Sequence, residues 1–278
     1  MMKNNTSNFF SQILGKIISI NAVRFVARFF RINYLGQRIY IWLFAPKRGI
    51  IEYVIENLSA QFYAKNYRDL MYLITTISAK DANESYTIKK LFENIEPGQV
   101  VYDIGAFIGF HGIFLAKHVG ESGRVVSFEP YAKNRQALLE NIALNQINNI
   151  TVVPVALGNQ DDEGFIHGDD FTIRQEGSLG EKVTVVVGDK IVLRNNLPLP
   201  NAVKIDVDGF EYKTILGLEK TLRSPMCQFL SCEIHPTLLP KDETEEMILD
   251  LVKSYGFTKI ERYDLKDVFH IFAKKVSN

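Results

Sequence analysis

The chain has very few cysteines, only Cys227 and Cys232 among 278 residues. We expect one strand over residues 226–234, and their odd spacing puts the two side chains on opposite faces of it. They therefore cannot pair with each other there, and we expect both to pack as small apolar residues. No spacing of cysteine and histidine predicts a disulfide or a zinc site.

The chain also lacks net charge and long apolar runs. Its 32 Lys and Arg balance 32 Asp and Glu, which argues against a nucleic-acid-binding protein that depends on overall charge. Near the N-terminus, Gln12, Lys16, Asn21 and Arg24 interrupt every window of about 20 residues, so no membrane-spanning helix is expected. No convincing signal peptide precedes the rest. We therefore expect a cytoplasmic protein.

Acidic residues are missing from residues 1–51, which carry eight Lys or Arg; the first acid is Glu52. The remaining 227 residues hold 24 bases and 32 acids, a net charge of −8. We expect residues 1–80 to form a basic amphipathic helical region, helical also over 52–80, and residues 81–278 to form a second domain. Such helices can pack on a domain as a lid, form the arm of a homodimer, lie peripherally on an anionic membrane, or serve as a mitochondrial presequence. The apolar positions that recur at helical spacing are Phe9, Phe10, Ile13, Leu14, Ile17 and Ile18, then Ala22, Val23, Phe25, Val26, Phe29 and Phe30.

The most informative run spans residues 100–112. A short β-branched segment, 100–104, predicts a buried parallel strand. Gly105 and Gly109 then bracket a bend, and residues 110–119 predict a helix. A strand, a glycine turn and a helix start are typical of a nucleotide-binding crossover, because glycine allows close approach and the helix offers free N–H groups.

The next predicted strand, within residues 124–130, ends in Glu129, 26 residues after Asp103. A carboxylate at this place can accept bonds from both ribose hydroxyls of an adenosine. The spacing Asp-x-Gly-x-x-x-Gly differs from the dinucleotide fingerprint Gly-x-Gly-x-x-Gly. It suits a ligand without phosphates, such as S-adenosylmethionine. The residues expected to bind this cofactor are Asp103, Gly105, Ala106, Phe107, Gly109, Glu129, Pro130, Tyr131, Ala156, Leu157 and Asp206. Asp103 and Gly105 would hold its amino acid end, and Tyr131 would cover the adenine, with Ala156 and Leu157 lining that pocket.

Five segments resemble a known family: VVYDIGAFIGFHG, VVSFEP, VPVALGN, VKIDVDGFEYKTILG and CEIHP, in this order. They are similar to the FkbM family of S-adenosylmethionine-dependent methyltransferases, over about residues 85–275. The family usually has Asn in place of Phe107, so this chain lacks one polar contact to the cofactor's amino acid end. It usually has Glu in place of Asp208, and the aspartate side chain has a shorter reach. The resemblance implies O-methylation of a hydroxyl on a sugar, glycan or secondary metabolite.

Helices and strands alternate after Glu129. We expect helices over 131–145, 210–222 and 243–254, strands over 150–154, 202–205 and 226–234, and an inserted hairpin over 158–187. The last two strands, 257–263 and 268–273, are too close for a parallel crossover and must be antiparallel. The predicted fold is α/β: a class I methyltransferase Rossmann-like sheet, mostly parallel with a C-terminal antiparallel hairpin, plus the N-terminal helical segment.

Ionisable residues follow the fourth and fifth predicted strands, and ligands bind at the carboxyl ends of such strands. Lys204 and Asp206 share one face, as do Glu233 and His235, and we expect all four at the rim of the cleft. His235 is the first candidate for a general base that deprotonates the acceptor, with Asp206 or Glu233 orienting it or acting instead. The alternative is a histidine satisfied at the rim before a proline turn.

Two acids near this cluster have structural interpretations. Asp208 is expected to cap the following helix, and Glu211 to supply charge to its first turn. These acids, with Asp206, Glu233 and His235, can offer ligands to Mg²⁺. Because they have competing structural roles, we expect no metal site.

Two other functions remain open. One is a nicotinamide-dependent oxidoreductase on a Rossmann-like fold, and the other is a non-catalytic cofactor-binding protein that associates with membranes. The expected partner is a small-molecule or glycan acceptor, not a nucleic acid.

Overall fold

The computed structural model describes residues 49–78, 83–167, 170–174 and 180–276. The chain divides into two compact units, one ending at Thr87 and the other beginning at Ile88. The helices expected in residues 1–48 lie outside the described residues. Within the described ranges, no helix is both long and apolar enough to cross a membrane.

The first unit contains a β-hairpin where a helix was expected. β1 (Ile50–Ile55) pairs antiparallel with β2 (Leu58–Tyr63), and α4 (Tyr67–Ser78) follows. The prediction of helix throughout 52–80 is therefore wrong over the hairpin. Along β1 the burial alternates, with Tyr53 and Ile55 buried and Val54 exposed. This period of two, in a β-branched and aromatic run, outweighs the weaker helical spacing.

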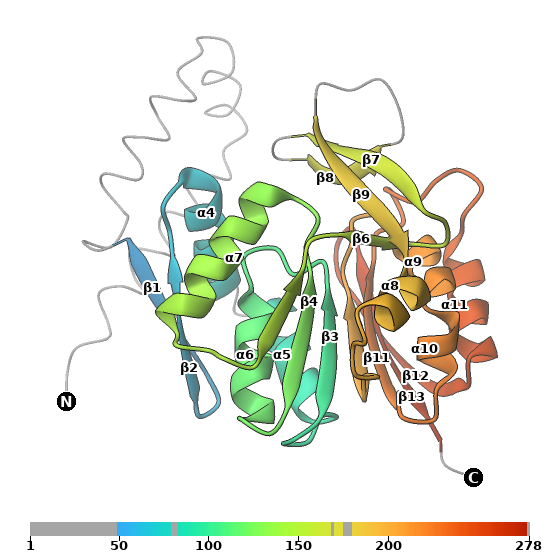
Figure 1. The fold of residues 1–278 in the computed structure, drawn as a ribbon, viewed down its shortest axis with the longest axis horizontal. Coiled ribbons are helices and arrows are strands. Elements are labelled where there is room, and N and C mark those ends of the chain that lie inside the picture. Colours follow the sequence, from blue (N-terminus) through green and yellow to red (C-terminus); the bar gives the residue numbers. More distant parts are fainter. Residues whose placement is uncertain (1–48, 79–82, 168–169, 175–179, 277–278) are drawn as a thin grey trace. The chain divides into compact units, whose positions relative to one another are not determined.

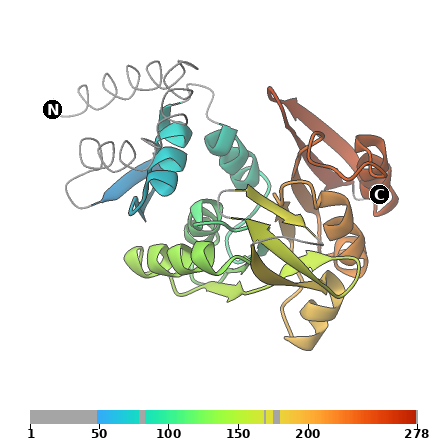
Figure 2. The same cartoon turned by 90° about the horizontal axis from the view of Figure 1, so that it is seen from above.

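A seven-stranded sheet forms the centre of the second unit, in the order β12-β13-β11-β10-β3-β4-β5 (Figure 1). The pairs from β5 to β11 are parallel, whereas β13 runs antiparallel to both β11 and β12. The antiparallel pair closes one edge of the sheet, shown in red in Figure 2. This confirms the predicted class I methyltransferase fold. The strands are β3 (Val100–Ile104), β4 (Arg124–Phe128), β5 (Ile150–Val153), β10 (Ala202–Ile205), β11 (Phe229–Ile234), β12 (Phe257–Asp264) and β13 (Phe269–Lys275).

The helices of this unit follow from amphipathic segments between the strands. α5 (Asn83–Phe92) leads into the sheet, α6 (Phe110–Val119) packs on β3, β4 and β5, and α7 (Ala132–Leu144) packs on β5. The helix expected over 210–222 is interrupted at Leu218 into α9 (Glu211–Gly217) and α10 (Glu219–Arg223). α9 also contacts β11 and α11 (Glu245–Ser254), and α8 (Gly188–Arg194) contacts β9. The apolar residues of β3, β10 and β11 form the main core with α8, α9, α10 and α11.

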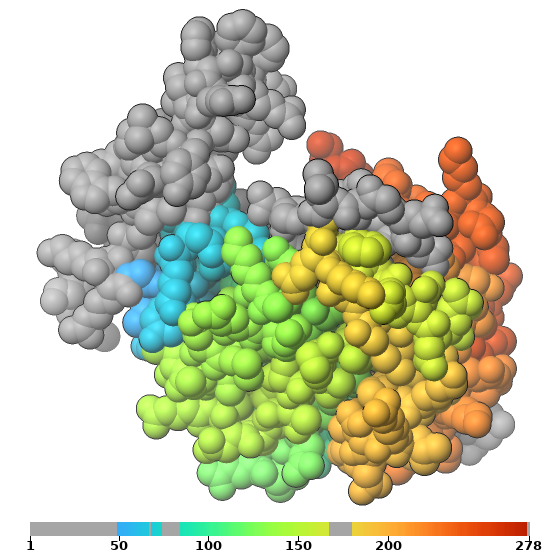
Figure 3. All heavy atoms as spheres, turned by 45° about the horizontal axis from the view of Figure 1, so that its top comes forward, coloured from blue at the N-terminus to red at the C-terminus, as the bar shows by residue number. Residues whose placement is uncertain are grey.

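A second sheet of four strands replaces the simple hairpin expected over 158–187. Its order is β6-β9-β7-β8, from β6 (Ala156–Gly158), β7 (Asp162–His167), β8 (Asp170–Arg174) and β9 (Glu181–Val187). β7 and β9 are the expected antiparallel pair, and β6 runs parallel to β9. Figure 3 shows this sheet, in yellow, on the surface of the unit. Its Ile166 and Val183 pack on Tyr131, which lies three residues after the end of β4, so the small sheet lies beside the carboxyl ends of the large one.

Candidate active site

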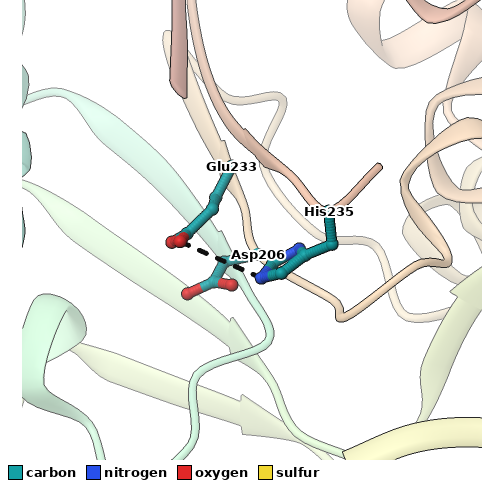
Figure 4. Close-up of side chains that lie close together, drawn as sticks. All are labelled: Asp206, Glu233 and His235. Carbon is teal, nitrogen blue, oxygen red and sulfur yellow. Dashed lines mark ion pairs between the residues drawn. The ribbon is translucent and has the colours of Figure 1, made fainter. Parts of the chain in front are cut away.

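Three neighbouring strands bring the predicted catalytic residues to one edge of the large sheet. Lys204 on β10 is level with Asp103 on β3 and with Ser231 on β11. The residues after β10 therefore lie between the turn after β3 and the end of β11. Figure 4 shows Asp206, Glu233 and His235 facing one another there, with one ligating atom of each within 4.8 Å of the others.

The turn after β3 is shaped by two glycines. Gly105 has φ +80°, and a Cβ there would lie 1.8 Å from the carbonyl oxygen of Asp206. The turn thus packs directly on the chain leaving β10, and only glycine fits. Gly109 has φ +88°, and a Cβ would lie 2.5 Å from Leu138 Cδ1. Between them Ala106 is buried and Phe107 takes a left-handed conformation, with φ +50°.

Glu129 holds this turn against the end of β4. Its Oε2 accepts the Phe107 N–H at 2.8 Å, and its Oε1 accepts the Tyr131 N–H at 2.9 Å and a longer bond from Asn134 Nδ2 at 3.4 Å. Only 4% of Glu129 is exposed. Burial raises its pKa to about 7, although the three hydrogen bonds act in the opposite direction. The carboxylate predicted to bind ribose is therefore fixed in place, and it titrates near neutral pH.

The predicted adenine contacts lie next to the small sheet. Tyr131 packs on that sheet, as described above, and the preceding Pro130 is half-buried. Ala156 packs with Val185 and Phe210, whereas Leu157 belongs to the main core. The structure places all four beside the end of β4 or on β6. Their contact with an adenine ring stays a prediction.

Lys204 is buried between two carboxylates at the carboxyl ends of β3 and β10. Its Nζ lies 3.3 Å from both Asp103 Oδ1 and Asp206 Oδ2, and it donates to the carbonyl oxygen of Gly105 at 3.1 Å. Burial disfavours the ionised form of Asp206, but the positive charge of Lys204, and then that of His235, lowers its pKa overall. Asp103 is fully buried beside Lys204. Its predicted contact with the cofactor's amino acid end stays a prediction.

His235 has a carboxylate on each side of its ring. Nδ1 lies 2.8 Å from Oε1 of Glu211, which is fully buried. Nε2 lies 3.4 Å from Asp208 Oδ1 and 3.9 Å from Glu233 Oε1. The second oxygen of the Glu233 carboxylate, Oε2, lies 3.3 Å from His270 Nε2.

The expectation that Asp208 caps the following helix is wrong. The capping position of α9 is Phe210, and no side chain accepts a hydrogen bond there. Asp208 instead adopts φ +48°, which turns its carboxylate toward His235. Asp is among the residues that tolerate this left-handed conformation.

These contacts set the protonation of the cluster. Burial lowers the pKa of His235, but the hydrogen bond to Glu211 and the nearby acids raise it, to about 9 overall. Burial, followed by the charge of Asp206, raises the pKa of Asp208 to about 6. The cluster therefore holds a proton on His235 in a site crowded with negative charge. It is suited to accepting and releasing a proton, or to attracting a cationic ligand.

The oxygen and nitrogen atoms of Asp206, Glu233 and His235 are also spaced closely enough to accommodate a divalent cation. However, Asp206 already faces Lys204, and Glu233 faces His270. Because these side chains already have basic partners, we keep the prediction of no metal site.

Sequence reasoning missed the contact of Glu211 with His235 and the burial of Lys204. One signal was present for Lys204, because strands in register place it opposite Asp103, a residue of opposite charge. For Glu211 no local signal exists, because its partner lies 24 residues further along the chain.

Comparison with known proteins gives four findings. A methyltransferase FkbM domain matches residues 103–259. Hexuronic acid methyltransferase AglP of Haloferax volcanii is 30% identical over 185 residues, which are 64% of this chain and 73% of the relative. Among solved structures, an S-adenosylmethionine-dependent O-methyltransferase from Thermotoga maritima has a TM-score of 0.48 at 15% identity, covering 76% of this chain and 71% of that one. Precorrin-6y C5,15-methyltransferase from Geobacter metallireducens has a TM-score of 0.46 at 15% identity, covering 71% and 90%.

Proposed function

Because the chain belongs to the FkbM family of S-adenosylmethionine-dependent methyltransferases, we propose that it methylates a hydroxyl oxygen of a sugar. The cofactor is S-adenosylmethionine. A nicotinamide-dependent oxidoreductase is not favoured, because the chain belongs to a methyltransferase family and its sheet has the antiparallel end of that fold.

The residues around the turn after β3 fit the cofactor chemically. An ionised carboxylate has about four acceptor positions, and among the described residues Oε2 of Glu129 accepts one hydrogen bond, from the Phe107 N–H. Glu129 therefore retains the capacity to accept a ribose hydroxyl. Gly105, Ala106, Phe107 and Gly109 would present backbone groups to the amino acid end, and Asp103 would help to hold the same end. Pro130, Tyr131, Ala156 and Leu157 would surround the adenine. Asp206 would lie nearest the sulfonium, where its negative charge is favourable.

The ionisable cluster is the proposed site of the reaction. When bound, S-adenosylmethionine would supply its sulfonium methyl group to a hydroxyl oxygen of the acceptor, with the electron pair of the C–S bond staying on sulfur in S-adenosylhomocysteine. His235 Nε2 accepts the proton that the hydroxyl loses. Glu233 and Asp206 orient His235 and stabilise its positive charge. General-base assistance of this kind contributes about 10²–10⁴-fold to the rate.

The raised pKa of His235 has a consequence for this role. At pH 7 a histidine with a pKa of about 9 carries its proton and cannot act as a base. A bound sulfonium is a second positive charge nearby, and like charges disfavour the protonated form. We therefore expect turnover to increase with pH between about 7 and 9.

The sugar acceptor is inferred from the hexuronic acid methyltransferase that matches this chain. The observation that carries the proposal is the cluster of Asp206, Glu233 and His235 beside the turn after β3. The test is transfer of tritium from S-[methyl-³H]adenosylmethionine to glycosides of glucuronate and galacturonate, with neutral hexosides as controls. His235→Ala should bind S-adenosylhomocysteine normally and lose at least about 100-fold in turnover. If His235→Ala methylates an acceptor as fast as the wild type does, His235 is not the base.

We propose in addition that residues 1–80 are a separate region, and that its basic part makes peripheral contact with anionic membranes. The support is compositional: residues 1–51 contain eight Lys or Arg and no acid. Liposome flotation would compare the chain with a variant in which Arg24, Arg28 and Arg31 are changed to Glu. Equal flotation of the two would refute the contact. Light scattering on the same two proteins would test whether this region joins two chains.

A further inference from the structure

Glu211 is a buried acid next to the proposed base, His235. It is fully buried at the start of α9, and its Oε1 lies 2.8 Å from Nδ1 of His235. A buried carboxylate costs free energy unless it is paired and hydrogen-bonded. Among the described contacts of Glu211, the imidazole of His235 is the closest basic group.

This contact fixes the state of the histidine ring. An ionised carboxylate can only accept hydrogen bonds, so Nδ1 must carry the proton that Glu211 accepts. When His235 is neutral, its lone pair is therefore on Nε2. Nε2 is the nitrogen that faces Asp208 and Glu233 at the ends of the strands.

We propose that Glu211 is the positioning residue of His235, holding its Nδ1 so that Nε2 faces the acceptor hydroxyl. This inference rests on the proposed role of His235 as the base. Glu211 itself touches neither the acceptor nor the cofactor. It acts by fixing the ring and by stabilising the imidazolium that forms when the hydroxyl proton is accepted.

Glu211 also has a local structural contact, and the test must separate the two. Its Oε1 accepts the N–H of Gly209 at 2.9 Å, which stabilises the turn before α9. A glutamine at this position keeps an oxygen that can accept both bonds, but it removes the negative charge. Glu211→Gln therefore changes the electrostatics of His235 with little change in the turn.

The pKa of His235 depends on every charged group around its ring, so Glu211→Gln removes only part of the increase. An opposite charge within about 4–6 Å changes a pKa by about 1–3 units. Removing the charge of Glu211 should lower the pKa of His235 by an amount in this range, from about 9. The other charged groups around His235 stay in place in this variant and maintain part of the increase in its pKa. They are Asp206 and Asp208 after β10, Glu233 on β11, and the basic side chains Lys204, His111 and His270 that face those acids.

The first experiment is a histidine titration by NMR, which needs no acceptor. The full chain has five histidines, and His235→Gln identifies the signal of His235. We expect the wild type to titrate near 9, with ¹⁵N shifts that place the neutral-state proton on Nδ1, and Glu211→Gln to titrate about 1–3 units lower. The matched control is Asp69→Asn, a buried acid of the first unit that pairs with Arg68 instead, and it should leave the signal unchanged. An unchanged His235 titration in Glu211→Gln would overturn the proposal.

The second experiment measures methyl transfer to a hexuronate glycoside as a function of pH. In Glu211→Gln the acidic limb of kcat/KM should move to lower pH by the same amount as the NMR titration, while affinity for S-adenosylhomocysteine stays unchanged. The double variant Glu211→Gln/His235→Ala should have the turnover of His235→Ala alone, because the two residues act as one unit. The positioning role would be overturned if the losses of turnover in the two single variants add up in the double variant. It would also be overturned if the acidic limb of kcat/KM stays in place while the NMR titration moves. If the wild type methylates no hexuronate, the proposed acceptor fails, and the NMR titration still decides whether Glu211 controls His235.

Discussion

Changing Glu129 to glutamine gives the sharpest test of the cofactor site. The carboxylate is held by the backbone N–H groups of Phe107 and Tyr131, and it is proposed to accept a ribose hydroxyl. A hydrogen bond to a charged group contributes about 1.5–3 kcal/mol. Glu129→Gln should therefore weaken the binding of S-adenosylhomocysteine by about 10–150-fold, because each 1.4 kcal/mol is a factor of ten.

The dependence of binding on pH tests the same contact without relying on the predicted 10–150-fold loss of affinity. With a pKa of about 7 in the free chain, Glu129 is about 9% ionised at pH 6 and about 91% at pH 8. If only the ionised form binds ribose well, the apparent Kd is the intrinsic Kd divided by the ionised fraction. Affinity should therefore be about 10-fold weaker at pH 6 than at pH 8. Glu129→Gln should lose this difference.

Ionisation of the Glu129 carboxyl should favour cofactor binding but destabilise the folded chain without ligand. The pKa of Glu129 is higher in the folded chain, about 7, than its usual 4.5, so the folded state binds more protons between these values. Its contribution to stability is present below about pH 4.5 and is lost as the pH rises through 7. The difference corresponds to about 3 kcal/mol. Without ligand, the wild type should lose this much stability over that range relative to Glu129→Gln.

Isothermal titration calorimetry at pH 6, 7 and 8 measures the affinities, and urea unfolding at pH 4.5, 6, 7 and 8 measures the stabilities. The matched control is Glu121→Gln, an exposed acid in the turn after α6. It should show the affinity and pH dependence of the wild type. If Glu129→Gln binds S-adenosylhomocysteine as tightly as the wild type at pH 8, Glu129 does not hold the ribose, and the proposed cofactor site is wrong.

Three further changes have expected outcomes. Gly105→Ala should lower Tm in scanning calorimetry by several degrees or prevent folding, because its Cβ would lie 1.8 Å from the carbonyl oxygen of Asp206 at φ +80°. Lys204→Met should cost about 3–5 kcal/mol in urea unfolding, because it leaves the carboxylates of Asp103 and Asp206 without their shared cation. Thr244→Ala removes the side chain that caps α11 and should cost about 0.5–2 kcal/mol in the same assay, while affinity for S-adenosylhomocysteine stays unchanged.

Elements with strong local patterns could be predicted from the sequence almost to the residue. β3 and α6 have the bounds expected for them, because a β-branched run, two glycines and an amphipathic segment follow one another there. The antiparallel order of β12 and β13 also followed from the short connection between them. The helix over 52–63 was wrong, because the β-branched and aromatic run there has a period of two that outweighs its helical spacing, and β1 pairs with β2.

Contacts between distant residues were much harder to predict. The gathering of Asp206, Glu233 and His235 could be anticipated, since the carboxyl ends of parallel strands meet at one edge. Their individual partners could not, because the rotation of each side chain depends on packing from other elements. Glu211 illustrates this, since a first-turn acid that could face solvent instead packs fully buried against a residue after β11.

The sheet order explains why the adenosine contacts and the ionisable cluster separate. β3 lies between β4 and β10, so the chain first crosses to one side of β3 and later returns to the other. The carboxyl end of β3 is thus the point where the strand order reverses, and ligands bind at such points. Glu129 follows β4 on one side, whereas His235 follows β11 on the other. A ligand that spans this point must present its ribose to the first side and its reactive group to the second, as S-adenosylmethionine does with an adenosine at one end and a sulfonium beyond it. Lys204 contacts Asp103 and the carbonyl oxygen of Gly105 at the end of β3 and Asp206 after β10, so it joins the cofactor turn to the ionisable cluster, and its loss should weaken cofactor binding and turnover together.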